Sequence, residues 1–215
     1  AAAVETRPDL DSHDILGRYL HAFNPRSSAF LQYGLFIRDF SDVSVHYQIH
    51  DFQAGFDYDF SPNTSLLFEA GYFRATGDTN IDPGLTLLAR LRKTFRRGNI
   101  TLGVQRGWDT GYIEVVPRGF TRFWSTDGQI TYQLLEKLDA YAGIMYRKNR
   151  YGSDELDILG GEPLADDETY TGRCGLSWRF YRWFSADLRY AYRKRLSEDI
   201  KDEFTDNRVT LTLRA

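Results

Sequence analysis

Apolar and polar residues alternate along most of this chain with a period of two. In the clearest stretch, residues 51–60, the apolar positions are Phe52, Ala54, Phe56, Tyr58 and Phe60. The intervening positions are Asp51, Gln53, Gly55, Asp57 and Asp59. Successive side chains of a β-strand point to opposite faces, so the rings share one face and the acids the other. The segment Ser61-Pro62-Asn63-Thr64 then predicts a tight turn into a second amphipathic strand.

The same two-strand unit occurs 37 residues earlier. His13-Asp14 corresponds to His50-Asp51, and the turn at 24–28 corresponds to the turn at 61–65. A supersecondary unit that repeats at a fixed spacing predicts an array of hairpins. We therefore expect an all-β fold, an antiparallel up-and-down meander closed into a barrel.

Eleven strands are visible along the chain. They cover 13–23, 28–39, 45–60, 64–76, 85–96, 99–108, 120–134, 138–149, 169–180, 183–195 and 204–214. Their connections alternate between tight turns and longer loops, the longest being 150–168. This asymmetry is typical of outer-membrane barrels, which have short periplasmic turns and long outer loops. The strands are also longer than the globular mode of about 5–6 residues, and a membrane strand needs about 9–11.

Composition agrees with this class. The chain has 14 Tyr, 15 Phe and 4 Trp, and aromatic residues cluster beside the tight turns, where an interfacial girdle would lie. No apolar run of 18 residues occurs, which excludes transmembrane helices but not a transmembrane barrel. A soluble sandwich or a lipocalin-like barrel gives the same alternation. A soluble protein, however, avoids so broad an aromatic outer face.

The number of strands predicts an incomplete barrel. With eleven strands the two ends lie on opposite sides, whereas bacterial barrels have an even number of strands. We expect an even total of 12 or more strands in the full protein. Residues 1–12 are expected to be an outer loop or a truncated upstream segment, and residues 13–215 the transmembrane barrel.

The carboxyl-terminal sequence resembles a known family. Tyr190-Ala191-Tyr192-Arg193-Lys194-Arg195, followed by acids and then 204–214, resembles the end of the putative β-barrel porin 2 family. The turns at 23–28 and 60–65 look like the periplasmic turns of that family. The resemblance implies an outer-membrane porin-like barrel of Gram-negative bacteria, associated with exopolysaccharide export, and it brings no catalytic residues. One departure is Ala215, where such barrels usually end on an aromatic residue.

Charged residues fall on the polar faces of the strands and predict the lining of a lumen. The lining set is Arg90, Arg92, Arg173, Arg179, Arg189, Arg193, Arg208, Asp51, Asp57 and Asp187, and Arg18, Arg96, Glu69, Asp59, Asp127 and Asp139 share these faces. Acids are expected mainly on the earlier strands and bases on the later ones. In a wide lumen opposed walls of charge select ions; in a narrow lumen the same groups pair and plug it.

Other chemistry has weaker support. Ser12-His13-Asp14 has the residue types of a catalytic triad, but strand neighbours point to opposite faces and cannot form one. His46 and His50 share a face, yet further metal ligands are missing at a recognisable spacing. The acids Asp154, Glu155, Asp157, Glu162, Asp166, Asp167 and Glu168 could bind Ca²⁺ or bridge to lipopolysaccharide, although a solvated outer loop explains them more simply.

The sequence thus predicts a bacterial outer-membrane barrel that acts as a passive conduit for anionic saccharides or small solutes. The alternative is a structural barrel that anchors or encloses a partner in an envelope or polysaccharide-export complex. An outer-membrane enzyme is the third alternative, and neither catalysis nor a cofactor is predicted. The expected partners are membrane lipid and lipopolysaccharide. Nucleic acid is not an expected partner: the net charge of −3 argues neither for nor against it, and acids and bases are interleaved with no sustained basic run. The single Cys174 excludes an internal disulfide.

Overall fold

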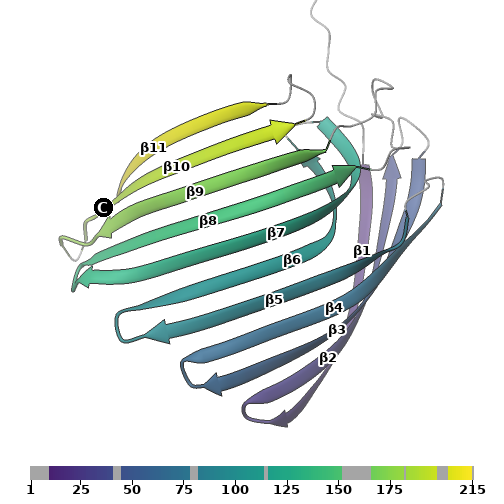
Figure 1. Ribbon diagram of the computed structural model, residues 1–215, viewed down its shortest axis with the longest axis horizontal. Helices are drawn as coiled ribbons and strands as arrows, with labels where there is room; N and C mark the ends of the chain where they lie inside the picture. Colours follow the sequence, from purple (N-terminus) through teal and green to yellow (C-terminus); the bar gives the residue numbers. More distant parts are fainter. Residues whose placement is uncertain are drawn as a thin grey trace, which may run out of the picture.

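One antiparallel sheet of eleven strands in sequence order makes up the fold (Figure 1). The computed structural model describes residues 10–40, 45–77, 82–113, 116–151, 166–181, 183–197 and 203–214. The strands are β1 (Leu10–Asn24), β2 (Ser27–Phe40), β3 (Val45–Ser61), β4 (Thr64–Gly77), β5 (Gly84–Phe95), β6 (Gly98–Ile113), β7 (Val116–Leu135), β8 (Leu138–Tyr151), β9 (Asp167–Trp178), β10 (Ser185–Ser197) and β11 (Phe204–Arg214). The predicted all-β, up-and-down class is confirmed.

The two turns that are equivalent in the sequence repeat have the same local structure. Asn24 Oδ1 accepts a hydrogen bond of 2.8 Å from the Arg26 backbone N–H, and Ser61 Oγ accepts one of 3.3 Å from the Asn63 N–H. A proline at the first central position of each turn fixes φ in advance. The strand register shifts beside both turns. The tight turns lie along one rim of the sheet, at the lower left of Figure 1.

Strand limits agree with the prediction to within three residues, except at one hairpin. Residues 109–119 were expected to form a loop, and this expectation is wrong for most of them. β6 continues to Ile113 and β7 begins at Val116, so the two strands form a long hairpin. Gly111, Pro117 and Gly119 suggested a loop because these residues usually end strands. The register shift between Thr110 and Tyr112 shows how the ladder accommodates an extra residue.

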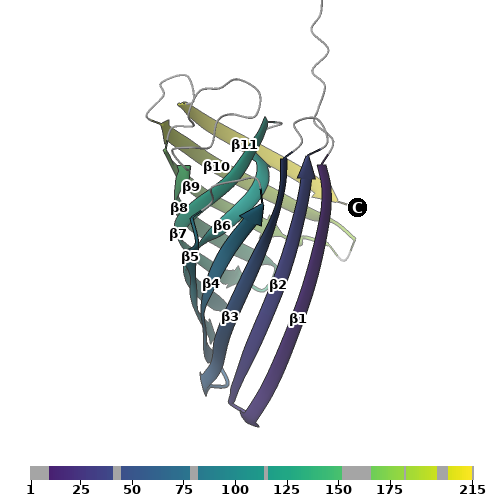
Figure 2. The same cartoon turned by 90° about the vertical axis from the view of Figure 1, so that its right-hand side faces the viewer.

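The sheet curves strongly, so that its first and last strands form facing walls (Figure 2). β1 and β11 are the edge strands and are not paired with each other in the part of the chain that the structure describes. The prediction of an even total of strands therefore stays a prediction. No helix among the described residues is long and apolar enough to cross a membrane.

The two faces of the sheet differ as the alternation predicted. Contacts between strands that are not neighbours occur on the polar face, such as Arg173 on β9 with Gln129 on β7, so this face is concave. The convex face carries exposed apolar side chains from nearly every strand, among them Tyr19, Phe52, Phe56, Leu102, Ile144, Trp178, Leu188, Val209 and Leu213. Phe23, Phe60, Tyr181 and Trp183 are exposed beside the tight turns, at the predicted girdle.

Candidate functional site

The concave face is the candidate functional site, and the residues predicted to line a lumen all lie on it or at its rim. Residues that pair directly across neighbouring strands lie on the same face of the sheet. Arg90 pairs with Leu67 and Gly103, and Arg92 pairs with Ser65 and Thr101. Asp51 and Asp57 lie on the concave face of β3. On β10, the concave face carries Asp187, Arg189 and Arg193. Arg208 on β11 joins this face, because it pairs with Ala191 of β10, as Asp206 pairs with Arg193. Arg179 follows β9 and forms an ion pair of 3.6 Å with Asp139.

Acids and bases are less separated on this face than the sequence suggested. β3 and β4 carry Asp51, Asp57 and Glu69, as expected. β1, β2 and β5 add Arg18, Arg38, Arg90 and Arg92 to the same wall, and the opposite wall contains acids as well as arginines. Many of these charges are paired: Arg38 with Asp14, Arg189 with Asp187, Arg147 with Asp109 at 3.2 Å, and Arg208 with Asp206 at 3.7 Å. Pairing reduces the transverse field that separated walls would produce.

The part of the β6–β7 hairpin that carries Trp108 and Phe120 lies across the concave face and narrows it. Trp108 on β6 reaches Phe36 on β2, with the ring centroids 4.8 Å apart in an edge-to-face arrangement. Four strand spacings separate β2 from β6 along the wall, about 19 Å at about 4.8 Å each. Side-chain contact over that span requires the hairpin to bend toward the inner wall. Trp108 pairs with Arg122, and Phe120 pairs with Thr110. By alternation these residues belong to the outward face of β6 and β7. Because the hairpin bends inward, this face of the hairpin packs against the inner side of β2–β4.

A hydrophobic cluster holds the hairpin in this position. Tyr47, Ile49, Phe73 and Phe120 are buried together, with Phe36, Ala75 and Trp108 packed around them. Phe73 and Phe120 have ring centroids 5.3 Å apart, and Trp108 stacks on Phe120 at 6.1 Å. Aromatic pairs at these distances contribute about 0.5–1.5 kcal/mol each beyond area burial. The cluster therefore forms a fixed constriction on the inner face.

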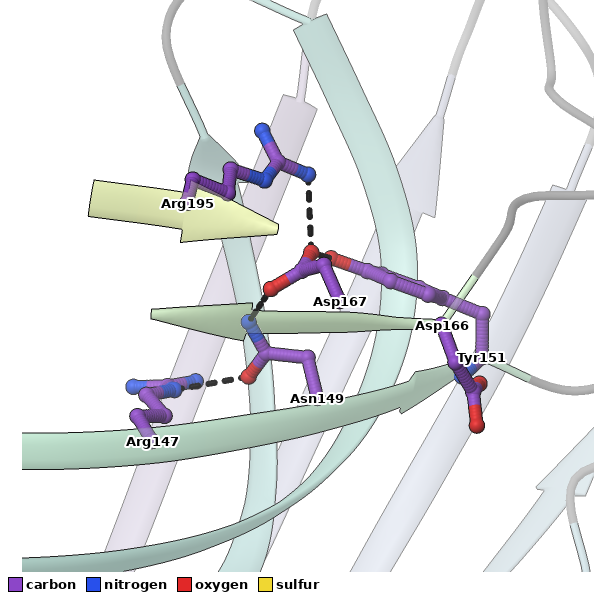
Figure 3. A network of polar contacts seen from close by, with 6 residues as sticks. All are labelled: Arg147, Asn149, Tyr151, Asp166, Asp167 and Arg195. Carbon is purple, nitrogen blue, oxygen red and sulfur yellow. Dashed lines mark hydrogen bonds and ion pairs between the residues drawn. The ribbon is translucent and has the colours of Figure 1, made fainter. Parts of the chain in front are cut away.

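A buried polar network joins β8, β9 and β10 on the opposite wall (Figure 3). The Asp167 carboxylate accepts hydrogen bonds from Arg195 at 2.7 Å, from the Tyr151 hydroxyl at 2.8 Å and from Asn149 Nδ2 at 2.8 Å. Asn149 Oδ1 in turn accepts from Arg147 Nε at 2.7 Å. Asp167 is 1% exposed and Arg195 4% exposed. A charge pair this deep is stable only with further hydrogen bonds, which Tyr151 and Asn149 donate to the Asp167 carboxylate.

The alternative sites considered from the sequence have mixed outcomes. His13 and His21 lie on the outward face of β1, while Asp14, the acid of the tripeptide, lies on the inward face, where it pairs with Arg38. His46 and His50 share the outward face of β3; His46 contacts Asp39, and His50 Nδ1 lies 2.8 Å from the Tyr33 hydroxyl. Groups of three metal-binding side chains do not occur among the described residues.

Two of the seven predicted loop acids belong to a strand, which corrects that expectation. Asp167 and Glu168 are the first residues of β9. Asp167 is buried in the polar network, and Glu168 forms an ion pair of 2.8 Å with Lys148. Asp166 immediately precedes the strand, whereas Asp154, Glu155, Asp157 and Glu162 lie outside the described residues.

Sequence reasoning did not find the residues that shape the inner face most. Trp108 and Phe120 stood at the ends of their expected strands, and their long-range packing has no local signal. Arg195 continues the row of Asp187, Arg189 and Arg193, so alternation alone would have placed it on the inner face. Its burial could not be foreseen, because Asp167 was assigned to a loop.

The curved antiparallel sheet, with apolar residues outside and ionic residues inside, defines a protein of the β-barrel class. The sequence model of the putative β-barrel porin 2 family matches residues 123–215, from within β7 to the carboxyl end. The predicted family resemblance is confirmed over that range, which includes 190–214; the turns at 23–28 and 60–65 lie outside it.

Two solved structures match this chain at low sequence identity, and the first of them shows a similar fold. The ferric enterobactin receptor of Pseudomonas aeruginosa, crystallised as a G324V mutant, superposes with a TM-score of 0.62 and 11% identity. The comparison covers 96% of this chain but 40% of the receptor, so this chain corresponds to less than half of that protein. A KdgM porin matches with a TM-score of 0.33 and 12% identity, over 96% of this chain and 97% of that one. A search of curated proteins gives no match.

Proposed function

We propose that this chain is the wall of a bacterial outer-membrane barrel that conducts small solutes, anionic saccharides among them, by passive diffusion. The observation that carries the proposal is the opposite chemistry of the two faces. On β10, Leu188 is 46% exposed on the convex face, while its neighbours Asp187 and Arg189 lie on the concave face. Exposed apolar side chains are stable in lipid, and an ionic inner face keeps water in the lumen.

Exposed arginines on the concave face support the anionic part of the proposal. Arg90, Arg92, Arg173 and Arg189 are exposed although they project from the inner side of the sheet. Arg173 donates to Gln129 Oε1 at 2.9 Å, and this neutral partner does not compensate the charge of the guanidinium. Guanidinium groups bind carboxylates in a bidentate geometry, so a row of them favours anions such as uronate residues.

The test is ion conductance of the full chain in planar bilayers. We expect discrete channels whose reversal potential in a salt gradient indicates anion preference. Arg173→Ala and Arg189→Ala should reduce that preference. Arg150→Ala is the matched control, because the Arg150 side chain lies on the outward row of β8 and is 70% exposed. Absence of channels, or identical selectivity in all three variants, contradicts the proposal.

The second candidate is a structural barrel that anchors or encloses a partner in an envelope or polysaccharide-export complex. The inward hairpin favours it, because the cluster of Phe36, Phe73, Trp108 and Phe120 fills part of the inner face. A filled barrel would conduct in neither the wild type nor a variant that lacks Trp108. A conducting wild type would exclude this candidate.

Lipopolysaccharide is the proposed partner at the rim opposite the tight turns. On the outward row of β8, Leu138, Ala140, Ala142 and Ile144 are followed by Tyr146, Lys148 and Arg150. Cationic side chains just beyond an apolar band are placed to meet phosphate groups. The folded protein should therefore be more heat-stable in lipopolysaccharide than in phosphatidylcholine vesicles, and Lys148→Ala with Arg150→Ala should abolish the difference.

A further inference from the structure

A half-enclosed cavity of about 140 Å³ lies on the concave face beside the β6–β7 hairpin. Four neighbouring strands line it with polar groups: Asp51 and Gln53 from β3, Glu69 from β4, Thr86 from β5 and Gln105 from β6, with Trp108 at the hairpin. The cavity would hold roughly five waters at about 30 Å³ each, or one sugar-sized ring. Its position beside the constriction means that a solute crossing the lumen passes it.

The Asp51 carboxylate is fixed in orientation with one oxygen unused. Oδ2 accepts hydrogen bonds from Gln53 Nε2 at 2.9 Å and from Trp108 Nε1 at 3.2 Å. Oδ1 is buried and has no hydrogen-bond partner among the described residues, and the whole side chain is 5% exposed. Thr86 Oγ1, on the same cavity, is likewise buried and unpartnered. Unsatisfied buried acceptors are costly, so this arrangement suits a ligand that supplies hydrogen-bond donors.

The charges around the cavity favour a neutral ligand over a cation. Arg18 and Arg90 attract the Glu69 carboxylate electrostatically, and Arg106 also lines the cavity. The lining thus has two carboxylates, Asp51 and Glu69, with cationic side chains nearby, whereas Ca²⁺ prefers six to eight oxygen ligands with several carboxylates among them. A hydroxyl group both donates and accepts, so it can satisfy Asp51 Oδ1 and Thr86 Oγ1 and also bond the amides of Gln53 and Gln105.

We propose that this cavity binds one neutral, hydroxyl-bearing ring, a monosaccharide unit, with Asp51 Oδ1 as the principal acceptor and Thr86 beside it. The inference rests on the proposed conduit function and gives that conduit a saccharide subsite. A free sugar and a unit within an oligosaccharide share this chemistry. An oligosaccharide would also touch the arginines of the opposite wall, so it should bind more tightly than its monomer if the subsite lies on the conduction path.

The test is calorimetric titration of the folded full chain with D-glucose, D-mannose and maltotriose. The detergent is a dimethylamine oxide, because glucoside detergents would compete. Asp51→Asn and Thr86→Val should each weaken sugar binding at least about tenfold, since a hydrogen bond to a charged group is worth about 1.5–3 kcal/mol. Asp39→Asn is the matched control, because Asp39 pairs with His46 on the outward row and so lies on the face of the sheet opposite the cavity. It should bind like the wild type.

Several results would overturn the inference. These are absence of sugar binding by the folded wild type, equal affinities of the Asp51→Asn and Asp39→Asn variants, and binding of CaCl₂ in place of sugar. Thr86→Val is nearly isosteric, so it keeps the test valid if Asp51→Asn fails to fold. Channels that conduct without sugar binding refute the subsite alone. Sugar binding by a protein that does not conduct refutes the conduit and leaves the cavity as a sugar site.

Discussion

Trp108 Nε1 donates a hydrogen bond to Asp51 Oδ2 at 3.2 Å and thereby joins β6 to β3 across the concave face. Two strands, β4 and β5, lie between the partners in the sheet. The contact therefore exists only because the β6–β7 hairpin bends toward the inner wall. It also orients Asp51, so one interaction both places the constriction and prepares the proposed sugar site.

Removing the Trp108 ring should release the hairpin and widen the lumen. Trp108→Ala is expected to raise single-channel conductance and to lower the free energy of unfolding by about 3 kcal/mol, as for other large-to-small changes at aromatic clusters. Trp108→Phe keeps the ring packing and loses one hydrogen bond, worth about 1 kcal/mol. Its conductance should stay close to the wild-type value. Equal conductance of all three proteins would contradict the assigned role of the hairpin.

Gly55 is required by the ring that lies above it. A Cβ at position 55 would meet Phe30 Cζ at 2.2 Å, and the Arg18 guanidinium lies 3.6 Å from the centroid of the same ring. Gly55→Ala should displace the ring and cost about 1–3 kcal/mol in urea unfolding from lipid vesicles. Gly17→Ala is the control, because nothing lies within 4 Å of the added Cβ. A loss of stability as large at position 17 would refute this packing argument.

The buried network on β8–β10 should depend on its central carboxylate. Asp167→Ala removes the acceptor of Arg195, Tyr151 and Asn149, and is expected to cost about 3–5 kcal/mol because it leaves a buried guanidinium without this carboxylate. Asp206→Ala breaks an exposed pair with Arg208 and should change stability by less than about 1 kcal/mol. Urea unfolding of both variants gives the comparison. Similar losses would mean that burial does not set the strength of the pair.

Placing a charge on the convex face should be costly if that face meets lipid. Leu188→Arg is expected to destabilise the folded protein by about 2–4 kcal/mol, the cost of arginine near the bilayer midplane. Thr131→Arg introduces the same side chain on the concave row of β7, where the cost should be less than about 1 kcal/mol. Folding titrations in phosphatidylcholine vesicles measure both. A smaller penalty at 188 than at 131 would reverse the assignment of the faces.

The sequence was sufficient to predict the number of visible strands, most of their limits and their faces, because these follow from local alternation. Asp51 and Phe52 lie on opposite faces as expected, and the two repeat-equivalent turns share their side-chain hydrogen bonds. Parity alone was enough to place the residues predicted to line a lumen on one face of the sheet. Long amphipathic strands specify register strongly, since a slip of one residue exchanges the two faces.

What alternation could not predict is how the faces meet in three dimensions. Trp108 has outward parity yet packs on the inner wall, because the hairpin that carries it bends as a unit. Asp167 lay in an acid-rich segment that resembled a solvated loop, and only its partner Arg195, 28 residues later, makes it a buried strand residue. Contacts at such separation depend on the curvature of the whole sheet, which no local pattern encodes.

Spin labels along β10 test the central claim most directly. Labels at positions 186–192 of the protein folded in lipid vesicles report collision rates with oxygen, which concentrates in lipid, and with a water-soluble nickel complex. We predict alternation with a period of two: 186, 188, 190 and 192 accessible to oxygen, and 187, 189 and 191 accessible to nickel. Burial of 188 from both reagents, with 187 and 189 in water, would place the apolar face in a shared interior and contradict the membrane-barrel account.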